Sequence, residues 1–180
     1  MTSAAQLQAL LDREAIRECL YRYCRGIDRA DEDALRSAYW DDATDCHGAW
    51  NGSAEGFIDQ AMQRLRKGGR RVHHLNNVSI ELHDEVAAVE SYFLALQAPA
   101  EPAGQQTFLC GRYVDRFERR HDEWRIAART VVYDWIEERK RPELGLENDA
   151  LFGGLRQPVG RAAPHDAVYA LLREVRARGE

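Results

Sequence analysis

The segment VHHLNNVSIELHDE, residues 72–85, is where the periodicity of the sequence changes from that of helices to that of strands. Val78, Ile80 and Leu82 alternate with polar residues, which predicts a strand with one buried face, and His-Asp-Glu after them predicts a turn. Further strands are expected over residues 86–97, 107–119 and 123–137. Because turns or a single loop join consecutive strands, we expect an antiparallel meander.

A helix is expected near the N-terminus, well before this segment. Ser3 and Gln6 have the spacing of a capping box, and the apolar residues after them fall on one helical stripe. These apolar residues are Ile16, Leu20, Tyr23 and Ile27. Asp28 falls on the neighbouring stripe, at the margin of the buried face and near the predicted end of the helix.

Three shorter elements are expected between this helix and the first long strand. They are a helix over residues 32–40 capped by Asp31, a strand over residues 43–50, and a helix capped by Ser53 that reaches about Lys67. Helices that precede a long meander of strands indicate an α+β fold.

The C-terminal part of the sequence differs from the rest. Residues 139–163 contain prolines and several glycines and predict an irregular arm, and a last helix is expected to start at residues 164–166. Its apolar face would consist of Val168, Leu171, Leu172 and Val175. We therefore expect one domain over residues 1–138, with residues 139–180 as an arm and helix that pack on the same domain or on a neighbouring subunit.

The composition is that of a globular protein and excludes some classes of function. The 180 residues are 44% hydrophobic and 31% charged, with a formal net charge of −5. Nucleic-acid binding usually requires a basic surplus, so a nucleic-acid partner is not expected. No apolar run approaches the roughly 18 residues that span a membrane, and the N-terminus does not resemble a signal peptide. A cytoplasmic location without membrane contact is therefore expected.

One acid and one histidine are the best candidates for chemistry. A carboxylate that holds one imidazole nitrogen leaves the other nitrogen free to accept a proton, and Asp28 and His73 have suitable settings for this. Simple alternation from Val78 instead places His74 on the core face. A bulge at Asn76–Asn77 would reverse this and turn His73 inward. The pattern alone leaves both histidines open, and both could be structural.

Other kinds of site have little support in the sequence. Asp45, Cys46 and His47 offer metal ligands, but the spacings typical of zinc or iron sites are missing, so no metal is expected. No cofactor fingerprint or G-x-S-x-G nucleophile motif is present. The cysteines do not form a C-x-x-C pair and are expected to be small core residues. Arg112 and Arg129 lie in apolar strands. Such arginines usually pair with surface carboxylates, but one that faced inward would bind an anion or polarise a carbonyl or leaving group.

Several motifs, taken together, resemble one family. They are Ala15-Ile16-Arg17, Gly26-Ile27-Asp28, Trp40-Asp41-Asp42-Ala43, His73 followed by Asn77, the run from Gly111 to Arg120, and Trp124-Arg125-Ile126. In this order they resemble the SnoaL-like branch of the NTF2-like superfamily over about residues 5–137. This branch includes hexachlorocyclohexane dehydrochlorinase, scytalone dehydratase and bile-acid 7α-dehydratase. The resemblance implies a cone-shaped roll, in which a curved antiparallel sheet wraps helices around one deep pocket.

The resemblance also implies a site. The family's catalytic acid and base match Asp28 and His73, which favours the bulge. Its pocket positions match Tyr23, Cys24, Asp45, Leu94, Leu96, Leu109, Tyr113, Arg129 and Tyr133. Asp45 departs from the pattern, because the dehydrochlorinase has tryptophan there, and a carboxylate suits a hydroxylated ligand better than a polychlorinated one.

The activity that the resemblance implies is that of a cofactor-free lyase acting on a small hydroxylated aromatic or alicyclic compound. Elimination of water is one form of it, and deformylation of an aromatic diol is a variant that needs the same base. The alternative is a non-catalytic protein that binds a ligand, or an assembly subunit like the small subunit of a ring-hydroxylating dioxygenase. In either case a homo-oligomer, a trimer or a dimer, is expected.

Overall fold

The computed structural model describes residues 3–100, 104–140 and 160–178. Its elements in chain order are α1 (Ala4–Arg29), α2 (Glu32–Arg36), β1 (Tyr39–His47), β2 (Trp50–Ser53), α3 (Ala54–Leu65), β3 (Gly69–His83), β4 (Val86–Pro99), β5 (Gln105–Arg120), β6 (Glu123–Lys140) and α4 (Ala167–Ala177). No helix in these described ranges is both long and apolar enough to cross a membrane.

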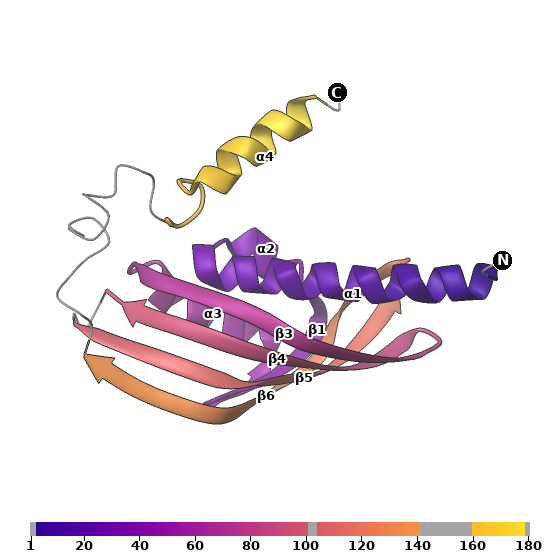
Figure 1. Cartoon of the computed structure of the whole chain (residues 1–180), viewed down its shortest axis with the longest axis horizontal. Helices are drawn as coiled ribbons and strands as arrows, with labels where there is room; N and C mark the ends of the chain where they lie inside the picture. Colours follow the sequence, from indigo (N-terminus) through magenta and orange to yellow (C-terminus); the bar gives the residue numbers. More distant parts are fainter. Residues whose placement is uncertain (1–2, 101–103, 141–159, 179–180) are drawn as a thin grey trace.

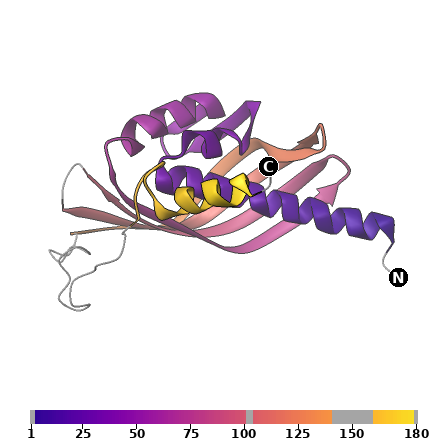
Figure 2. The same cartoon turned by 90° about the horizontal axis from the view of Figure 1, so that it is seen from above.

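The strands form one curved, unclosed sheet in the order β2-β1-β6-β5-β4-β3. Strands β3 to β6 pair antiparallel with their sequence neighbours, which confirms the predicted meander. Helices α1, α2 and α3 lie on one side of this sheet (Figures 1 and 2). The predicted α+β roll, with N-terminal helices packed in a curved sheet, is confirmed.

The core lies between α1, α3 and the inner face of the sheet. Ile16, Leu20 and Tyr23 on α1 are almost fully buried, as the predicted helical stripe requires. Alternate residues of β4 and β5, such as Phe93 and Phe117, cover the sheet side of the core. The buried stripe of α1 therefore holds the end of that helix, and Asp28 with it, against the sheet.

The predicted helix over residues 32–40 is too long, and the strand after it begins earlier than expected. Helix α2 ends at Arg36, and Tyr39 already belongs to β1. The reason is a tertiary contact: β1 pairs in parallel with β6, with Tyr39 opposite Ile126. A partner so distant in sequence leaves no local signal. The predicted strand over residues 43–50 is likewise divided by a turn into β1 and β2.

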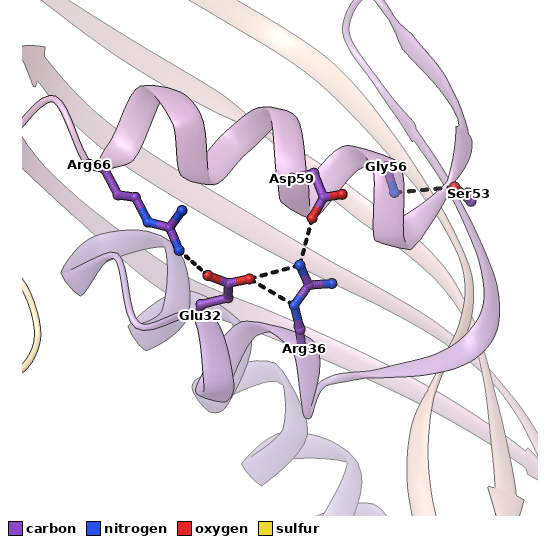
Figure 3. A network of polar contacts seen from close by, with 6 residues as sticks. All are labelled: Glu32, Arg36, Ser53, Gly56, Asp59 and Arg66. Atoms are coloured by element: carbon purple, nitrogen blue, oxygen red, sulfur yellow. Dashed lines mark hydrogen bonds and ion pairs between the residues drawn. The ribbon is translucent and has the colours of Figure 1, made fainter.

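The predicted helix caps are present. Ser3 and Gln6 form the capping box of α1, Asp31 caps α2, and Ser53 Oγ accepts a hydrogen bond from the Gly56 N–H at the start of α3. Ion pairs also link the two short helices: Figure 3 shows Arg36 of α2 between Glu32 and Asp59.

The C-terminal prediction is only partly covered by the described residues. Strand β6 continues to Lys140, past the predicted start of the arm, and residues 141–159 lie outside the described ranges. Asp166 caps α4, none of whose residues is fully buried. Arg29 pairs with Asp166, and Tyr169 donates a hydrogen bond to Asp31 over 2.7 Å, so this end contacts the junction of α1 and α2.

Candidate active site

Asp28 and His73 meet through two hydrogen bonds. Asp28 Oδ1 lies 2.6 Å from His73 Nδ1, and Asp28 Oδ2 accepts the main-chain N–H of His73 over 2.9 Å. Their side chains are 11% and 6% exposed. With the carboxylate charged, the proton on the ring belongs on Nδ1, which leaves Nε2 as the acceptor. Nε2 has no hydrogen-bond partner among the described residues.

A bulge in β3 turns His73 toward Asp28. Leu75 pairs with Phe93 but Val78 pairs with Ser91, so β3 has one residue more than β4 across Asn76–Asn77. Both asparagines are exposed. The extra residue puts His73 and Leu75 on the same face as Val78, and His74 on the outer face. The structure thus confirms the bulge and overrules simple alternation.

Aromatic rings connect the imidazole to the centre of the sheet. Phe93 lies 6.5 Å from His73 between ring centroids and stacks on Tyr113 at 4.5 Å. Tyr113 meets Tyr23 edge to face at 5.4 Å, and Phe93 meets Tyr133 at 6.3 Å. Three of the predicted pocket residues therefore line one interior surface with His73.

Arg129 faces inward, which is one of the two alternatives for the strand arginines, but it already forms an ion pair with Asp115. Its Nε and Nη2 donate to both oxygens of Asp115 over 2.7 and 2.6 Å, and its guanidinium carbon lies 4.0 and 4.1 Å from the ring centroids of Tyr23 and Tyr113. Burial is the largest single influence on the pKa of Arg129 and lowers it, but the charge and hydrogen bonds of Asp115, together with Tyr39 and Tyr23, raise the pKa above its ordinary value. Nη1 is the remaining donor. Arg112 faces outward and pairs with Glu90 and Asp134.

Asp45 is buried beside this ion pair, on the strand next to Arg129. Tyr39 donates a hydrogen bond to Asp45 Oδ2 over 2.7 Å. Asp45 Oδ1 has no hydrogen-bond partner among the described residues and lies 3.6 Å from His47 Nδ1, whose ring stacks on Phe57. The interior thus keeps polar groups that a hydroxylated ligand could satisfy.

An open pocket of about 420 Å³ lies beside Asp28, between the end of α1, the start of β3 and the segment before α4. Its lining residues are Asp28, Arg29, Leu65, Gly68, Gly69, Arg70, Arg71, Val72, Leu96, Ala98, Gln106, Gly160, Arg161 and Ala162. A second pocket of about 620 Å³, between α2 and α4, includes neither Asp28 nor His73. Of these two pockets, only the smaller is lined by Asp28, and the described lining of neither includes His73.

The remaining predicted pocket residues are not all on the same side of the sheet. Cys24 is buried on α1, and Leu109 lies on the inner face of β5 opposite Ala95. Leu94 and Leu96 lie on the outer face, 37% and 39% exposed, although Leu96 also borders the pocket beside Asp28. The inner positions of β4 belong to Phe93 and Ala95 instead.

Sequence reasoning did not single out Phe93 or Asp115 as site residues, and it considered His47 only as a possible metal ligand. Strand β4 is apolar on both faces, so its pattern contains no signal for the inner face. Asp115 becomes visible only through pairing with a distant residue. Within the described part of the chain, no three His, Cys, Asp or Glu side chains are grouped as a metal site would require.

The sequence matches the model of the SnoaL-like domain over residues 8–130. The chain belongs to the SnoaL-like domain family. This confirms the resemblance found in the sequence, and the match contains both Asp28 and His73. Among curated proteins, none has significant sequence similarity to the SnoaL-like chain.

Solved structures share the fold of the SnoaL-like chain. A type 2 hexachlorocyclohexane dehydrochlorinase is 22% identical with a TM-score of 0.69, covering 77% of this chain and 96% of its own. A candidate scytalone dehydratase from Novosphingobium aromaticivorans is 16% identical with a TM-score of 0.65, covering 72% and 88%. The beta subunit of a candidate aromatic-ring-hydroxylating dioxygenase from the same organism is 17% identical with a TM-score of 0.58, covering 72% and 93%. At these identities the similarity establishes the fold alone.

Proposed function

We propose that this SnoaL-like chain is a cofactor-independent lyase that acts on a small hydroxylated aromatic or alicyclic compound. The observation that carries the proposal is the Asp28–His73 pair, in which the carboxylate holds Nδ1 and leaves Nε2 available. Such a pair is sufficient for general base catalysis, which contributes roughly 10²–10⁴-fold to a rate. Asp28 orients the ring and stabilises the imidazolium that forms.

In the elimination that we propose, His73 Nε2 removes a proton from the carbon next to the one bearing the hydroxyl group. The electrons of the C–H bond form the new double bond, the C–O bond breaks, and the hydroxyl group leaves as water after protonation. Tyr23 and Tyr113 are the candidate donors of that proton, because their rings lie on the interior surface that also holds His73 and phenols are protonated at neutral pH. Arg129 Nη1 is a further donor that could stabilise a developing oxyanion.

Two further observations support this chemistry. A dehydrochlorinase and a candidate dehydratase, both named for eliminations, share the fold. The buried carboxylate of Asp45 suits a hydroxylated substrate. Deformylation of an aromatic diol is a variant of the proposal, because it requires the same base to remove a hydroxyl proton.

The test is turnover of a panel of hydroxylated aromatic and alicyclic compounds, followed by mass spectrometry for loss of water and by trapping of formaldehyde. His73→Ala and Asp28→Asn should each lower kcat by roughly 10²–10⁴-fold, because each removes part of the base. His74→Ala is the matched control, since His74 lies on the outer face of the same strand. If His73→Ala and Asp28→Asn both kept the wild-type rate on a substrate that the protein turns over, this function would be excluded.

A further inference from the structure

The described lining of the pocket beside Asp28 is rich in arginine. Among the described lining residues, four are arginines, Arg29, Arg70, Arg71 and Arg161, and Asp28 is the one carboxylate. Both oxygens of Asp28 already accept hydrogen bonds from His73. The chain as a whole has a net charge of −5, so this local excess of guanidinium groups is opposite in sign to the average.

Arg71 is the arginine best placed to receive a negatively charged group. Its Nη2 donates to the main-chain oxygen of Gly68 over 2.7 Å, and it forms no ion pair within the described ranges. Burial lowers its pKa, while the charge of Asp28 acts in the opposite direction. A half-buried guanidinium that is not paired with a carboxylate keeps unused N–H donors. Because the group is partly shielded from water, these donors would bind an anion strongly.

The backbone holds this guanidinium at the pocket wall. Gly68 and Gly69 have φ values of +93° and +101°, and a Cβ atom at Gly69 would lie 2.6 Å from the carbonyl oxygen of Ala98. The two glycines therefore let β3 start tightly against β4. The hydrogen bond from Arg71 to Gly68 then fixes the side chain over this start.

Another arginine of the pocket has a structural partner. Arg29 pairs with Asp166 over 3.4 Å and lies beneath Gly160, so it connects α1 to the segment before α4. Arg161 is exposed and adds positive charge at the rim. Arg161 therefore adds to the positive potential around Arg71 without needing to touch a ligand, whereas Asp166 largely balances the charge of Arg29.

The other lining residues are apolar. Leu65, Val72, Leu96 and Ala98 form walls that suit a hydrocarbon or aromatic body. We propose that Arg71 binds the anionic oxygen group, a carboxylate or a phosphate, of a substrate whose apolar body lies against these walls. This proposal depends on the proposed lyase function in one respect: it calls the bound acid a substrate. Binding of the acid beside Asp28 does not itself require that function.

The test measures binding to the full-length chain by calorimetry, with benzoate, phenyl phosphate and the neutral benzamide as probes. Both anions should bind more tightly than benzamide, and the tighter of the two shows which anionic group the pocket accepts. Arg71→Gln should weaken binding of that anion by at least about tenfold, and Arg71→Lys should weaken it less, because it keeps the charge but loses the fork.

Arg13→Gln is the matched control, because Arg13 also donates to a main-chain oxygen, that of Ala9, but does not line the pocket. It should bind the anions as the wild type does. Equal affinity for benzamide and the anions, no detectable binding of either anion, or unchanged anion affinity in Arg71→Gln would overturn the proposal. The same measurements in a His73→Ala background require no turnover, so they remain informative if the lyase function is wrong.

Discussion

At the scale of single residues, the site depends on one carboxylate that makes two different bonds. Asp28 binds the ring of His73 and also the main chain of the same residue. The main-chain bond fixes the carboxylate relative to β3, and the ring bond then fixes the imidazole. Because both bonds come from one side chain, the position of the ring is coupled directly to the end of α1. Replacement of Asp28 by asparagine keeps the shape but removes the charge that selects the tautomer.

The reactivity of the Cys24 thiol tests whether this side chain is buried on α1, next to the site. Burial raises the pKa of its thiol from 9.0 to about 12. Because the folded pKa is higher than the unfolded one, the thiol stabilises the fold below pH 9.0, and this contribution is lost as the pH rises above that value. At about pH 8, we expect Cys24 to resist a thiol-specific disulfide reagent while the partly exposed Cys46 and Cys110 react.

Mass spectrometry after labelling would measure this difference. Cys19 is the internal reference, since burial also raises its pKa to about 12. Both buried thiols should react only after denaturant is added. Labelling of Cys24 in the native protein as fast as Cys46 would contradict the buried position on α1.

At the scale of elements, the bulge in β3 decides which histidine faces inward. One extra residue between Leu75 and Val78 is enough, because side chains on a strand alternate between faces. Deletion of Asn76 should therefore turn His73 to the outer face and abolish turnover, while the helix content stays the same. The measurement is kcat together with circular dichroism.

Asn76→Ser is the control for this deletion, since it changes the side chain but keeps the residue count. It should retain activity close to the wild type. An active deletion variant would show that β3 reaches the same arrangement without the extra residue, and that the bulge does not position His73.

The bulge also shows what the sequence could and could not predict. Alternation of Val78, Ile80 and Leu82 predicts the strand correctly, but continued backward it selects His74. The exposed Asn76–Asn77 pair is compatible with a bulge and does not require one, so only the family resemblance favoured His73. In β4, both faces are apolar, and the residues expected in the pocket, Leu94 and Leu96, lie on the outer face.

Local signals predicted the elements best where the partners are near in sequence. The caps Asp31 and Ser53, and the antiparallel meander, depend on neighbouring residues, and the structure has them as predicted. The parallel pairing of β1 with β6 and the Asp115–Arg129 pair depend on contacts that the fold creates. No spacing in the sequence encodes these contacts. For this reason the helix predicted over residues 32–40 is longer than α2 in the structure.

At the scale of the whole molecule, the outer face of the sheet is unusually apolar. Leu94, Cys110 and Trp135 lie opposite one another on β4, β5 and β6, and Trp135 is 61% exposed. Val72, Leu96 and Phe108 form the adjacent row. Contiguous apolar surface of this kind is typical of an interface.

We propose that this face binds a second copy of the chain, in the dimer or trimer expected from the sequence. Sedimentation velocity should show one oligomeric species, and Trp135→Glu should shift it toward the monomer because it places a charge in the apolar row. Arg116→Glu, on the polar part of β5, serves as the control. A monomer at all concentrations would contradict the proposal, and aggregation of the isolated chain would favour an assembly subunit that requires a different partner.

The most direct test of the account is the tautomer of His73, measured by ¹⁵N NMR of the imidazole at neutral pH. The Asp28–His73 geometry predicts a proton on Nδ1 and an unprotonated Nε2, with this preference lost in Asp28→Asn. The resonance is assigned by its disappearance in His73→Ala. A wild-type spectrum with the proton on Nε2 would contradict the central claim, because the nitrogen that faces the substrate could not then act as a base.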